Sequence, residues 1–439
     1  MIVMKFGGTS VGSAERIEAV AKIVKDRLDK KPVVVVSAVA GTTNSLIKLA
    51  NEANKVAREQ LYEALVAKHE AIVQGLGLPA ELLDAEFEQL HELSSSGKKP
   101  SKKTIDSFVS FGERLCAILL ASTLVKMDVN AKAYPAWDLG MITDDAHGAA
   151  EPLPTSPALI SEKILALKAV PIITGYIGKT QKGEITTLGR GGSDYTAAII
   201  GAALKAEAIQ IWKEVDGILT TDPRLVPEAR VVSELAFEEA SELAYFGAKV
   251  LHPKTILPAM KAGVPVQVLN TFNPAGTGTT IVSSFTERKE KSHSVEAMTF
   301  KKGVTAIHVN SPEFFDGSGL MAQLFKIFEK HKTSIDVVST SVAGVSVTID
   351  NVEHLEALTD ALAELGTVTI EANKAVVCIV GGSVNAAGIA GKLFTVLGEN
   401  NIAVELISQA SGGVSLTFVV AESDAESALK VLHKSFIAS

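Results

Sequence analysis

Cysteine is scarce in this chain, whose 439 residues include only Cys116 and Cys378. The two lie far apart and lack the spacing of metal ligands, so the sequence excludes a disulfide framework and a zinc site and predicts buried thiols in a reducing compartment. Long apolar runs are also lacking, since none approaches the roughly 20 residues that cross a membrane. No basic segment followed by an apolar run opens the chain. We therefore expect a cytoplasmic protein with no membrane partner.

Positive charge is not in excess either. The net charge of -8 argues against nucleic acid as a partner. The apolar content of 47% and the charged content of 21% are those of an ordinary globular protein, and no segment has the composition of a disordered region. A chain of 439 residues is long enough for roughly two to four domains.

The segment from Met1 to Gly175 alternates apolar runs with amphipathic helical patterns, which predicts an α/β fold. Residues 32–36 read Pro-Val-Val-Val-Val, the pattern of a central parallel strand, and residues 170–175 and 208–212 predict two further buried strands. Helical patterns cover residues 45–93, ended by a Ser- and Gly-rich loop at 94–100, and residues 195–204.

A charged run at residues 287–291 is typical of an exposed linker and indicates a domain boundary near 284–293. Beyond it Gly319 and Gly388 are related by an offset of 69 (388 − 319 = 69), and the same offset relates the Gly-Val-Ser at 344–346 to that at 413–415. Each copy predicts the βαββαβ order of a ferredoxin-like module. We therefore predict a domain at 1–285 and two repeats at 294–373 and 374–439, with a strand at 294–300 that can pair with the second repeat.

A glycine-rich turn, Lys5-Phe6-Gly7-Gly8-Thr9-Ser10-Val11-Gly12, joins an apolar strand to a helix. One lysine, unhindered backbone N–H groups and two hydroxyls at a helix N-terminus favour anion binding. Ser13 is placed to cap that helix, in which apolar residues recur at helical spacing from Ile17 to Leu28. The turn is not a P-loop, because Ser13 stands where that motif requires lysine. By itself the segment also fits a turn without a ligand.

A second glycine-rich segment, residues 186–196, reads Thr-Thr-Leu-Gly-Arg-Gly-Gly-Ser-Asp-Tyr-Thr. Its glycines allow the backbone to approach a ligand, and Asp194 or Ser193 is placed to cap the following helix. Arg190 supplies a planar guanidinium that matches a carboxylate or phosphate. The alternative is a surface Arg190 and an Asp194 that only caps the helix. Two such helix starts in one domain favour a ligand.

Three further segments are open to more than one interpretation. Residues 212–224 leave a buried strand at the edge where open α/β sheets bind ligands, but a structural loop fits the spacing equally well. In residues 246–253, Lys249 lies close to a glycine, and His252 is more readily structural than catalytic. The spacing around Glu113 gives it no special role.

Six segments together resemble the successive motifs of the aspartate kinase family, in the family's order. They are Lys5 to Ser10, Ser37 to Asn44, Phe111 to Glu113, Thr187 to Thr196, Thr220 to Arg224 and Gly247 to Pro253. The resemblance covers the whole chain. The duplicated module is similar to the paired ACT domains of the monofunctional, lysine-sensitive branch of that family.

The resemblance implies an amino-acid kinase fold that transfers the γ-phosphoryl group of ATP, with Mg²⁺, to the β-carboxylate of L-aspartate. The product is 4-phospho-L-aspartate, and the reaction is the first step of lysine, threonine and methionine biosynthesis. A carboxylate of pKa about 3.9 is already ionised at neutral pH, so no general base is needed to activate it. Catalysis then depends on positioning and on neutralising the charge of two anions.

The same resemblance implies roles for individual residues. Lys5 and Asp194 are the implied catalytic pair. The implied contacts to ATP are Lys5, Gly7, Gly8, Ser10, Lys213, Glu214, Leu219, Arg224 and Lys249. The implied contacts to aspartate are Thr43, Glu113, Arg190 and Ser193. Arg190 suits the α-carboxylate of the substrate, and Glu113 suits its α-ammonium.

The chain departs from the family in the nucleotide segment, where Lys213-Glu214 replace a common Thr-Asp and Leu219 replaces a tyrosine. Side-chain contacts to adenine or ribose are therefore expected to differ there. In the first repeat, Val342 replaces a glutamate often found in the lysine-sensitive branch.

The resemblance further implies a homodimer formed through the ACT domains and feedback inhibition by an amino acid, L-lysine. The implied effector residues are Phe314, Gly319, Leu320, Ser334, Ile335, Asp336 and Ser341. We expect them to cluster at the helix start and the strand edge of the first repeat. Asp336 is the expected counter-charge of the lysine ammonium, and Gly319 would expose backbone N–H groups to its carboxylate.

Two other functions compete with this interpretation. Another amino-acid kinase, such as glutamate 5-kinase or acetylglutamate kinase, would share the phosphate-binding core, but the tandem ACT-like repeat opposes it. A non-catalytic amino-acid sensor would keep the fold and lose the chemistry, but the intact Lys5, Arg190 and Asp194 oppose it.

Overall fold

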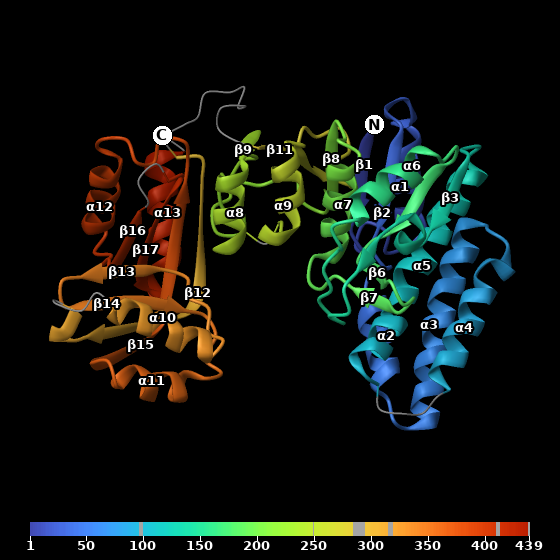
Figure 1. The fold of residues 1–439 in the computed structure, drawn as a ribbon. Helices are drawn as coiled ribbons and strands as arrows, with labels where there is room; N and C mark the ends of the chain where they lie inside the picture. Colours follow the sequence, from blue (N-terminus) through green and yellow to red (C-terminus); the bar gives the residue numbers. More distant parts are fainter. Residues whose placement is uncertain (96–99, 249, 284–294, 315–318, 410–412, 438–439) are drawn as a thin grey trace. The chain divides into compact units, whose positions relative to one another are not determined.

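The computed structural model describes residues 1–95, 100–248, 250–283, 295–314, 319–409 and 413–437 (Figure 1). The chain divides into two compact units. The first comprises Met1–Ile218, Ser233–Phe237 and Val250–Glu287. The second comprises Leu219–Val232, Glu238–Lys249 and Arg288–Ser439. Two segments of the predicted first domain thus group with the C-terminal repeats, and the predicted boundary at 284–293 lies outside the described residues.

An eight-stranded sheet forms the centre of the first unit, in the order β3-β5-β2-β1-β8-β10-β11-β9. The strands are β1 (Ile2–Phe6), β2 (Pro32–Val36), β3 (Ala131–Tyr134), β5 (Val170–Thr174), β8 (Ala208–Lys213), β9 (Glu234–Ala236), β10 (Val266–Asn270) and β11 (Thr279–Val282). From β3 to β10 in that order the neighbours are parallel, and β10 pairs antiparallel with β11. Every residue of β1 and β2 is buried, as predicted for central parallel strands.

Two groups of helices pack in this unit. The first group is α1 (Ala14–Lys25), α2 (Thr42–Asn51), α3 (Lys55–Leu76), α4 (Asp84–Ser94) and α5 (Lys102–Lys126). The second is α6 (Ser156–Leu165), α7 (Gly192–Ala203) and α9 (Pro253–Ala262). Met4 and Phe6 of β1 pack with the first group. Because side chains alternate along a strand, Lys5 lies on the opposite face, where β1 contacts α7.

A smaller sheet of β4 (Ile142–Thr143), β6 (Ile177–Thr180) and β7 (Ile185–Thr187) also belongs to the first unit, in the order β4-β6-β7. Strand β7 leads directly into the glycine-rich segment that precedes α7. This small sheet therefore supports the second predicted ligand-binding loop.

The helix after the first glycine-rich turn begins as predicted and ends earlier. The Ser13 side chain accepts a hydrogen bond from the Arg16 N–H, which confirms the predicted cap. Helix α1 stops at Lys25, and Leu28 lies in a short 3₁₀ turn where it is 36% exposed. The predicted continuation of the helix to Leu28 is wrong because the chain leaves the helix and turns through a left-handed Lys31 to enter β2 at Pro32.

Helix α5 has the length and hydropathy of a membrane span, but 78% of its most apolar stretch is buried inside the protein. That burial is typical of the core helix of a folded domain. It also carries Cys116, which is buried and unbonded, as is Cys378 on β15 (Thr367–Val380). The predicted buried thiols are confirmed.

A six-stranded antiparallel sheet forms the second unit, in the order β13-β14-β12-β15-β17-β16. Its elements besides β15 are β12 (Ala297–Asn310), α10 (Leu320–Lys330), β13 (Val338–Ser341), β14 (Gly344–Ile349), α11 (Leu355–Ala363), α12 (Ile389–Glu399), β16 (Leu406–Gln409), β17 (Ser415–Ala421) and α13 (Ala425–Phe436). Helix α8 (Phe237–Tyr245) lies almost entirely in this unit. The starts of α10 and α12 are related by the predicted offset of 69 (389 − 320 = 69), which confirms the duplication.

The two repeats share their central strands. Strands β12 and β15 pair along their length, with Ala297 opposite Val380 and Asn310 opposite Thr367. Residues 297–301 therefore pair with 376–380, in the second repeat, while the later part of β12 pairs within the first. The repeats form one continuous sheet with two separate apolar cores.

Candidate active site

A cavity of about 640 Å³ opens in the first unit beside the carboxyl ends of β1, β2 and β5. Open α/β sheets bind ligands at this edge. Of the residues predicted for the site, those that line the cavity are Lys5, Gly8, Thr43, Glu113, Arg190, Ser193 and Asp194. The sequence thus located one pocket from segments that lie far apart along the chain.

The first glycine-rich turn reaches the cavity through Lys5 and Gly8. A Cβ at Gly8 would lie 2.8 Å from the Ala38 carbonyl oxygen, so only glycine allows the two segments to approach this closely. Gly7 and Ser10 do not line the cavity. The Gly7 N–H donates to the Trp212 carbonyl, and the Ser10 hydroxyl is buried 2.7 Å from the Thr271 hydroxyl.

Asp194 is held between two lysines at the end of β1. Its Oδ1 lies 2.5 Å from Lys5 Nζ, and its Oδ2 lies 3.0 Å from Lys213 Nζ. Burial alone would raise the pKa of Asp194, but the charges of the two lysines outweigh it and lower that pKa to about 2. Lys213, predicted as a nucleotide contact, therefore lies beside the predicted catalytic pair, and Lys213 Nζ also donates to the Val250 carbonyl.

Helix α7 begins at Gly192, and its N-cap is Gly191 with φ of 69°, without a side-chain cap. The prediction that Ser193 or Asp194 caps this helix is wrong. Both residues lie in its first turn and are buried, because Asp194 is drawn into ion pairs with two lysines. Arg190, by contrast, is exposed at the cavity and makes no ion pair with the residues that the structure describes.

Glu113 lies in the middle of α5 and is only 3% exposed. Its Oε1 accepts a hydrogen bond of 3.1 Å from the Ala38 N–H, while its Oε2 has no hydrogen-bond partner among the described residues. Burial raises the pKa of Glu113 to about 8, although the Ala38 N–H acts in the opposite direction. One buried carboxyl oxygen is therefore left available at the cavity wall.

The sequence missed Tyr176 and Gly148, which also line the cavity. Tyr176 has a φ of 69°, a backbone conformation that side chains rarely adopt, and its N–H donates to the Thr196 hydroxyl. The available signal was position, because Gly175-Tyr176 directly follows the buried strand β5.

The other predicted nucleotide contacts do not line this cavity. Glu214 is exposed. Leu219 and Arg224 belong to the second unit, where the exposed Arg224 pairs with Asp222 at 2.5 Å. Lys249 lies outside the described residues. His252 caps α9 by accepting from the Lys254 N–H, which is the structural role expected for it.

Comparison with known proteins agrees with this geometry. A model of the amino acid kinase family matches residues 1–270, and a model of the ACT domain matches residues 377–436. Aspartokinase 2, chloroplastic, of Arabidopsis thaliana is 36% identical over an alignment of 459 positions, which covers 99% of this chain and 84% of that protein. The chain belongs to the aspartokinase family.

Solved structures of another aspartokinase share the fold over the whole chain. E. coli aspartokinase III in complex with aspartate and ADP (R-state) has a TM-score of 0.83 and 33% identity, covering 100% of both chains. The same protein in complex with lysine and aspartate (T-state) has a TM-score of 0.80 and covers 100% of this chain and 99% of that one. The predicted fold and the predicted aspartate kinase activity are confirmed, and the sensor and the other amino-acid kinases are set aside.

In this aspartokinase the predicted effector residues are not brought together within one chain. Gly319 is the N-cap of α10, and Phe314, Leu320 and Ser341 lie in or beside the elements at that end of the first repeat. Ser334, Ile335 and Asp336 follow the other end of α10, whose 11 residues span about 16 Å.

Asp336 has partners of its own in the second unit. Its side chain is 1% exposed, its Oδ2 lies 3.0 Å from Lys301 Nζ, and its Oδ1 accepts a hydrogen bond of 2.5 Å from the Tyr245 hydroxyl. Lys301 also pairs with Asp350 at 2.7 Å. A cationic ligand at Asp336 must therefore compete with groups already in place.

Proposed function

We propose that the cavity holds L-aspartate between Glu113 and Arg190, with its β-carboxylate directed toward Lys5. The observation that carries this assignment is the complementary pair at the cavity wall: a buried carboxyl oxygen without a partner and a guanidinium without an ion pair among the described residues. A substrate ammonium supplies the counter-charge that Glu113 lacks, and a substrate carboxylate matches the planar donors of Arg190. Thr43 and Ser193, which also line the cavity, supply hydroxyls to the same ligand.

Phosphoryl transfer in this pocket depends on charge rather than on a general base. The β-carboxylate of aspartate is ionised at neutral pH and attacks the γ-phosphorus without losing a proton, while the bond from this phosphorus to the β,γ-bridging oxygen breaks and ADP leaves. Lys5 offsets the negative charge that accumulates when two anions meet, and Gly8 allows close approach of the phosphates. Asp194 holds the ammonium groups of Lys5 and Lys213 at one point, so that no reorganisation is required during the reaction.

The residues present fit a Mg²⁺ ion that is bound mainly by the nucleotide. In the described part of the chain no group of three His, Cys, Asp or Glu side chains is arranged to hold a metal. Mg²⁺ commonly uses substrate phosphates and water with one or two carboxylates, and Asp194 is the ionised carboxylate nearest to Lys5. When bound, the ion would neutralise charge on the β- and γ-phosphates.

We further propose that L-lysine inhibits the enzyme at the first repeat of a homodimer. E. coli aspartokinase III has been solved with lysine, which supports this effector for a chain 33% identical to it. Because Gly319 and Asp336 lie at opposite ends of α10, one complete site would combine the Gly319 end of one subunit with the Asp336 end of its partner. Sedimentation of the protein with and without lysine tests the dimer.

The assignment of the pocket is tested by replacing Arg190 with lysine, which keeps the charge and removes the planar pair of donors. We expect the KM for aspartate to rise by roughly tenfold or more and the KM for ATP to change by less than about twofold. Arg230→Lys is the matched control, since Arg230 is exposed in the second unit, belongs to no predicted site and should leave both KM values unchanged. A rise in the KM for ATP alone in Arg190→Lys would make Arg190 a phosphate ligand.

A further inference from the structure

Asp106 is a second buried carboxylate on α5, outside the groups assigned to the reaction. It precedes Glu113 by seven residues, so the two carboxylates lie on the same side of the helix, two turns apart. Its side chain is only 3% exposed. Unlike Glu113, Asp106 uses both of its oxygens in hydrogen bonds within the protein.

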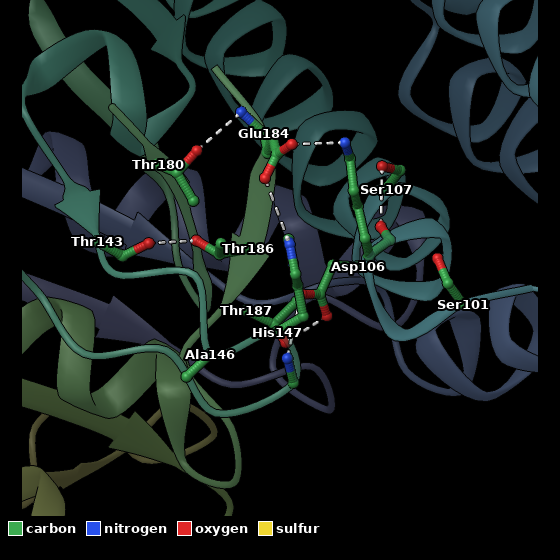
Figure 2. A network of polar contacts seen from close by, with 12 residues as sticks. Ser101, Asp106, Ser107, Thr143, Ala146, His147, Thr180, Glu184, Thr186 and Thr187 are labelled. Atoms are coloured by element: carbon green, nitrogen blue, oxygen red, sulfur yellow. Dashed lines mark hydrogen bonds and ion pairs between the residues drawn. The ribbon is translucent and has the colours of Figure 1, made fainter. Parts of the chain in front are cut away.

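Three donors converge on this carboxylate (Figure 2). Asp106 Oδ1 accepts from the Thr187 hydroxyl at 2.8 Å. Asp106 Oδ2 accepts from the Gly148 N–H at 3.1 Å and from His147 Nδ1 at 2.9 Å. Because an ionised carboxylate only accepts hydrogen bonds, Nδ1 is the ring nitrogen of His147 that carries a hydrogen.

The donors lie in or directly before two loops that line the cavity, one through Gly148 and the other through Gly189 and Arg190. Gly148 lines the cavity and has a φ of 89°. Thr187 ends β7 and directly precedes the segment that carries Arg190, and its carbonyl accepts from the Ala150 N–H at 2.8 Å. A Cβ at Gly189 would lie 3.4 Å from the Gly148 carbonyl oxygen, so the two loops also pack on each other. One carboxylate therefore ties both loops to the helix that carries Glu113.

His147 is braced from its other side as well. Its Nε2 lies 3.7 Å from Glu184 Oε2, and Glu184 Oε1 lies 2.7 Å from Lys103 Nζ, which is again on α5. The chain of contacts from Lys103 to Asp106 thus begins and ends on the same helix. This arrangement fixes the His147 ring against α5 at two points.

We propose that Asp106 is a positioning residue for substrate recognition, which sets the separation between the Arg190 loop and Glu113. The proposal rests on the assignment of Arg190 and Glu113 to the two α-substituents of aspartate. Charge-assisted hydrogen bonds to one carboxylate hold the two loops in fixed positions relative to each other and to α5. With its α-substituents fixed in this way, aspartate presents its β-carboxylate at one distance from Lys5, whereas L-glutamate, which has one more methylene group, carries its side-chain carboxylate beyond that distance.

The primary test is Asp106→Asn, which keeps the side-chain volume and turns one acceptor into a donor. We expect the KM for aspartate to rise by roughly tenfold or more, the KM for ATP to stay within about twofold, and the ratio of kcat/KM for aspartate over glutamate to fall. A general loss of stability would lower activity with both amino acids and would not change that ratio.

Two variants of His147 keep the proposal testable if Asp106→Asn folds poorly. His147 is only partly buried, so His147→Leu should fold while it removes the Nδ1 donor. His147→Asn places an amide N–H near the position of Nδ1 and should restore the KM for aspartate toward the wild-type value. Equal defects in His147→Leu and His147→Asn would contradict a role for this hydrogen bond.

Thr186→Val is the matched control, because Thr186 neighbours Thr187 on β7 and its buried hydroxyl bonds to Thr143 at 2.7 Å, away from Asp106. It should leave both KM values and the aspartate preference unchanged. The proposal is overturned if Asp106→Asn and His147→Leu keep a wild-type KM for aspartate and a wild-type preference, or if Thr186→Val reproduces their defect. If Arg190→Lys raises the KM for aspartate while these variants do not, only the positioning role fails and the assignment of the pocket stands.

Discussion

Glu113 in the kinase pocket and Asp336 in the first regulatory repeat are both carboxylates with almost no exposed surface, yet only Asp336 has a counter-ion in contact with it among the described residues. Among the described residues, one carboxyl oxygen of Glu113 has no hydrogen-bond partner. Asp336 gives both oxygens to Lys301 and Tyr245. An unpaired buried carboxylate destabilises the free protein but attracts a cationic ligand, whereas a paired one must lose a partner before a ligand can bind. The pocket proposed for the substrate is thus open to its ligand, and the site proposed for the effector is closed by internal contacts.

The largest expected effect is at the cation of the pocket. Lys5→Met removes the group that offsets the charge of the transferred phosphoryl and leaves Asp194 with Lys213 alone. We expect kcat to fall by on the order of a hundredfold or more. Steady-state kinetics measure this, and circular dichroism establishes that the variant is folded. Lys22→Met on α1, whose lysine is 62% exposed, is the matched control and should keep the wild-type kcat. Near-normal turnover in Lys5→Met would remove Lys5 from the reaction.

The next largest effect is expected at Asp336, the carboxylate that already has partners within the protein. Asp336→Ala should raise the lysine IC50 at fixed aspartate by about 10- to 150-fold, the range expected when a hydrogen bond to a charged group is lost. Each IC50 is normalised to the lysine-free rate of the same variant. An unchanged IC50 would place the effector elsewhere, and a wild-type enzyme insensitive to millimolar lysine would leave threonine or another amino acid to be tested.

Tyr245→Phe sharpens the same comparison, because it removes the competing hydroxyl and leaves the carboxylate in place. If lysine binds by displacing Tyr245, this variant should lower the lysine IC50 by a factor of roughly two to ten. The opposite shifts of Asp336→Ala and Tyr245→Phe would be the signature of a site closed by its own contacts. A higher IC50 in Tyr245→Phe would instead make the hydroxyl part of the lysine site.

Much of this architecture was predictable because it depends on local pattern. Short sequence patterns predict the apolar strands β1 and β2 and the Ser13 cap. The repetition of such patterns predicts the equal offset of α10 and α12. The order of the motifs also located the lining of the cavity. These features follow from periodicity, capping and repetition, which a single sequence records directly.

The charges of the site could not be predicted in the same way, since they depend on residues far apart in the chain. Glu113 is buried against Ala38, 75 positions away, and Tyr245 reaches Asp336 across 91 positions. Lys213 joins Asp194 only because β8 lies beside β1. The same ion pairs explain why Asp194 does not cap α7. Asp106 gave no signal at all, because its donors lie far from it in the sequence.

The raised pKa of Glu113 gives its unpaired carboxyl group a measurable effect on stability and on binding. Burial raises that pKa from the ordinary 4.5 to about 8, so the unfolded chain loses this proton at lower pH than the folded protein. The free protein therefore loses stability as pH rises from about 4.5 to about 8, and Glu113→Gln should reduce that loss. Aspartate, whose ammonium needs the ionised form, should bind more tightly as pH rises toward 8.

The claim that an unpaired Glu113 receives the substrate ammonium is tested most directly by calorimetric titration of aspartate at about pH 7, in two buffers that differ in ionisation enthalpy. With a pKa of about 8, Glu113 is mostly protonated at this pH in the free enzyme and must ionise to face the substrate ammonium. We predict the release of about one proton for each aspartate bound, and the loss of this release in Glu113→Gln. A binding enthalpy that is the same in both buffers would show that no proton leaves, and would contradict a substrate pocket built around an unpaired Glu113.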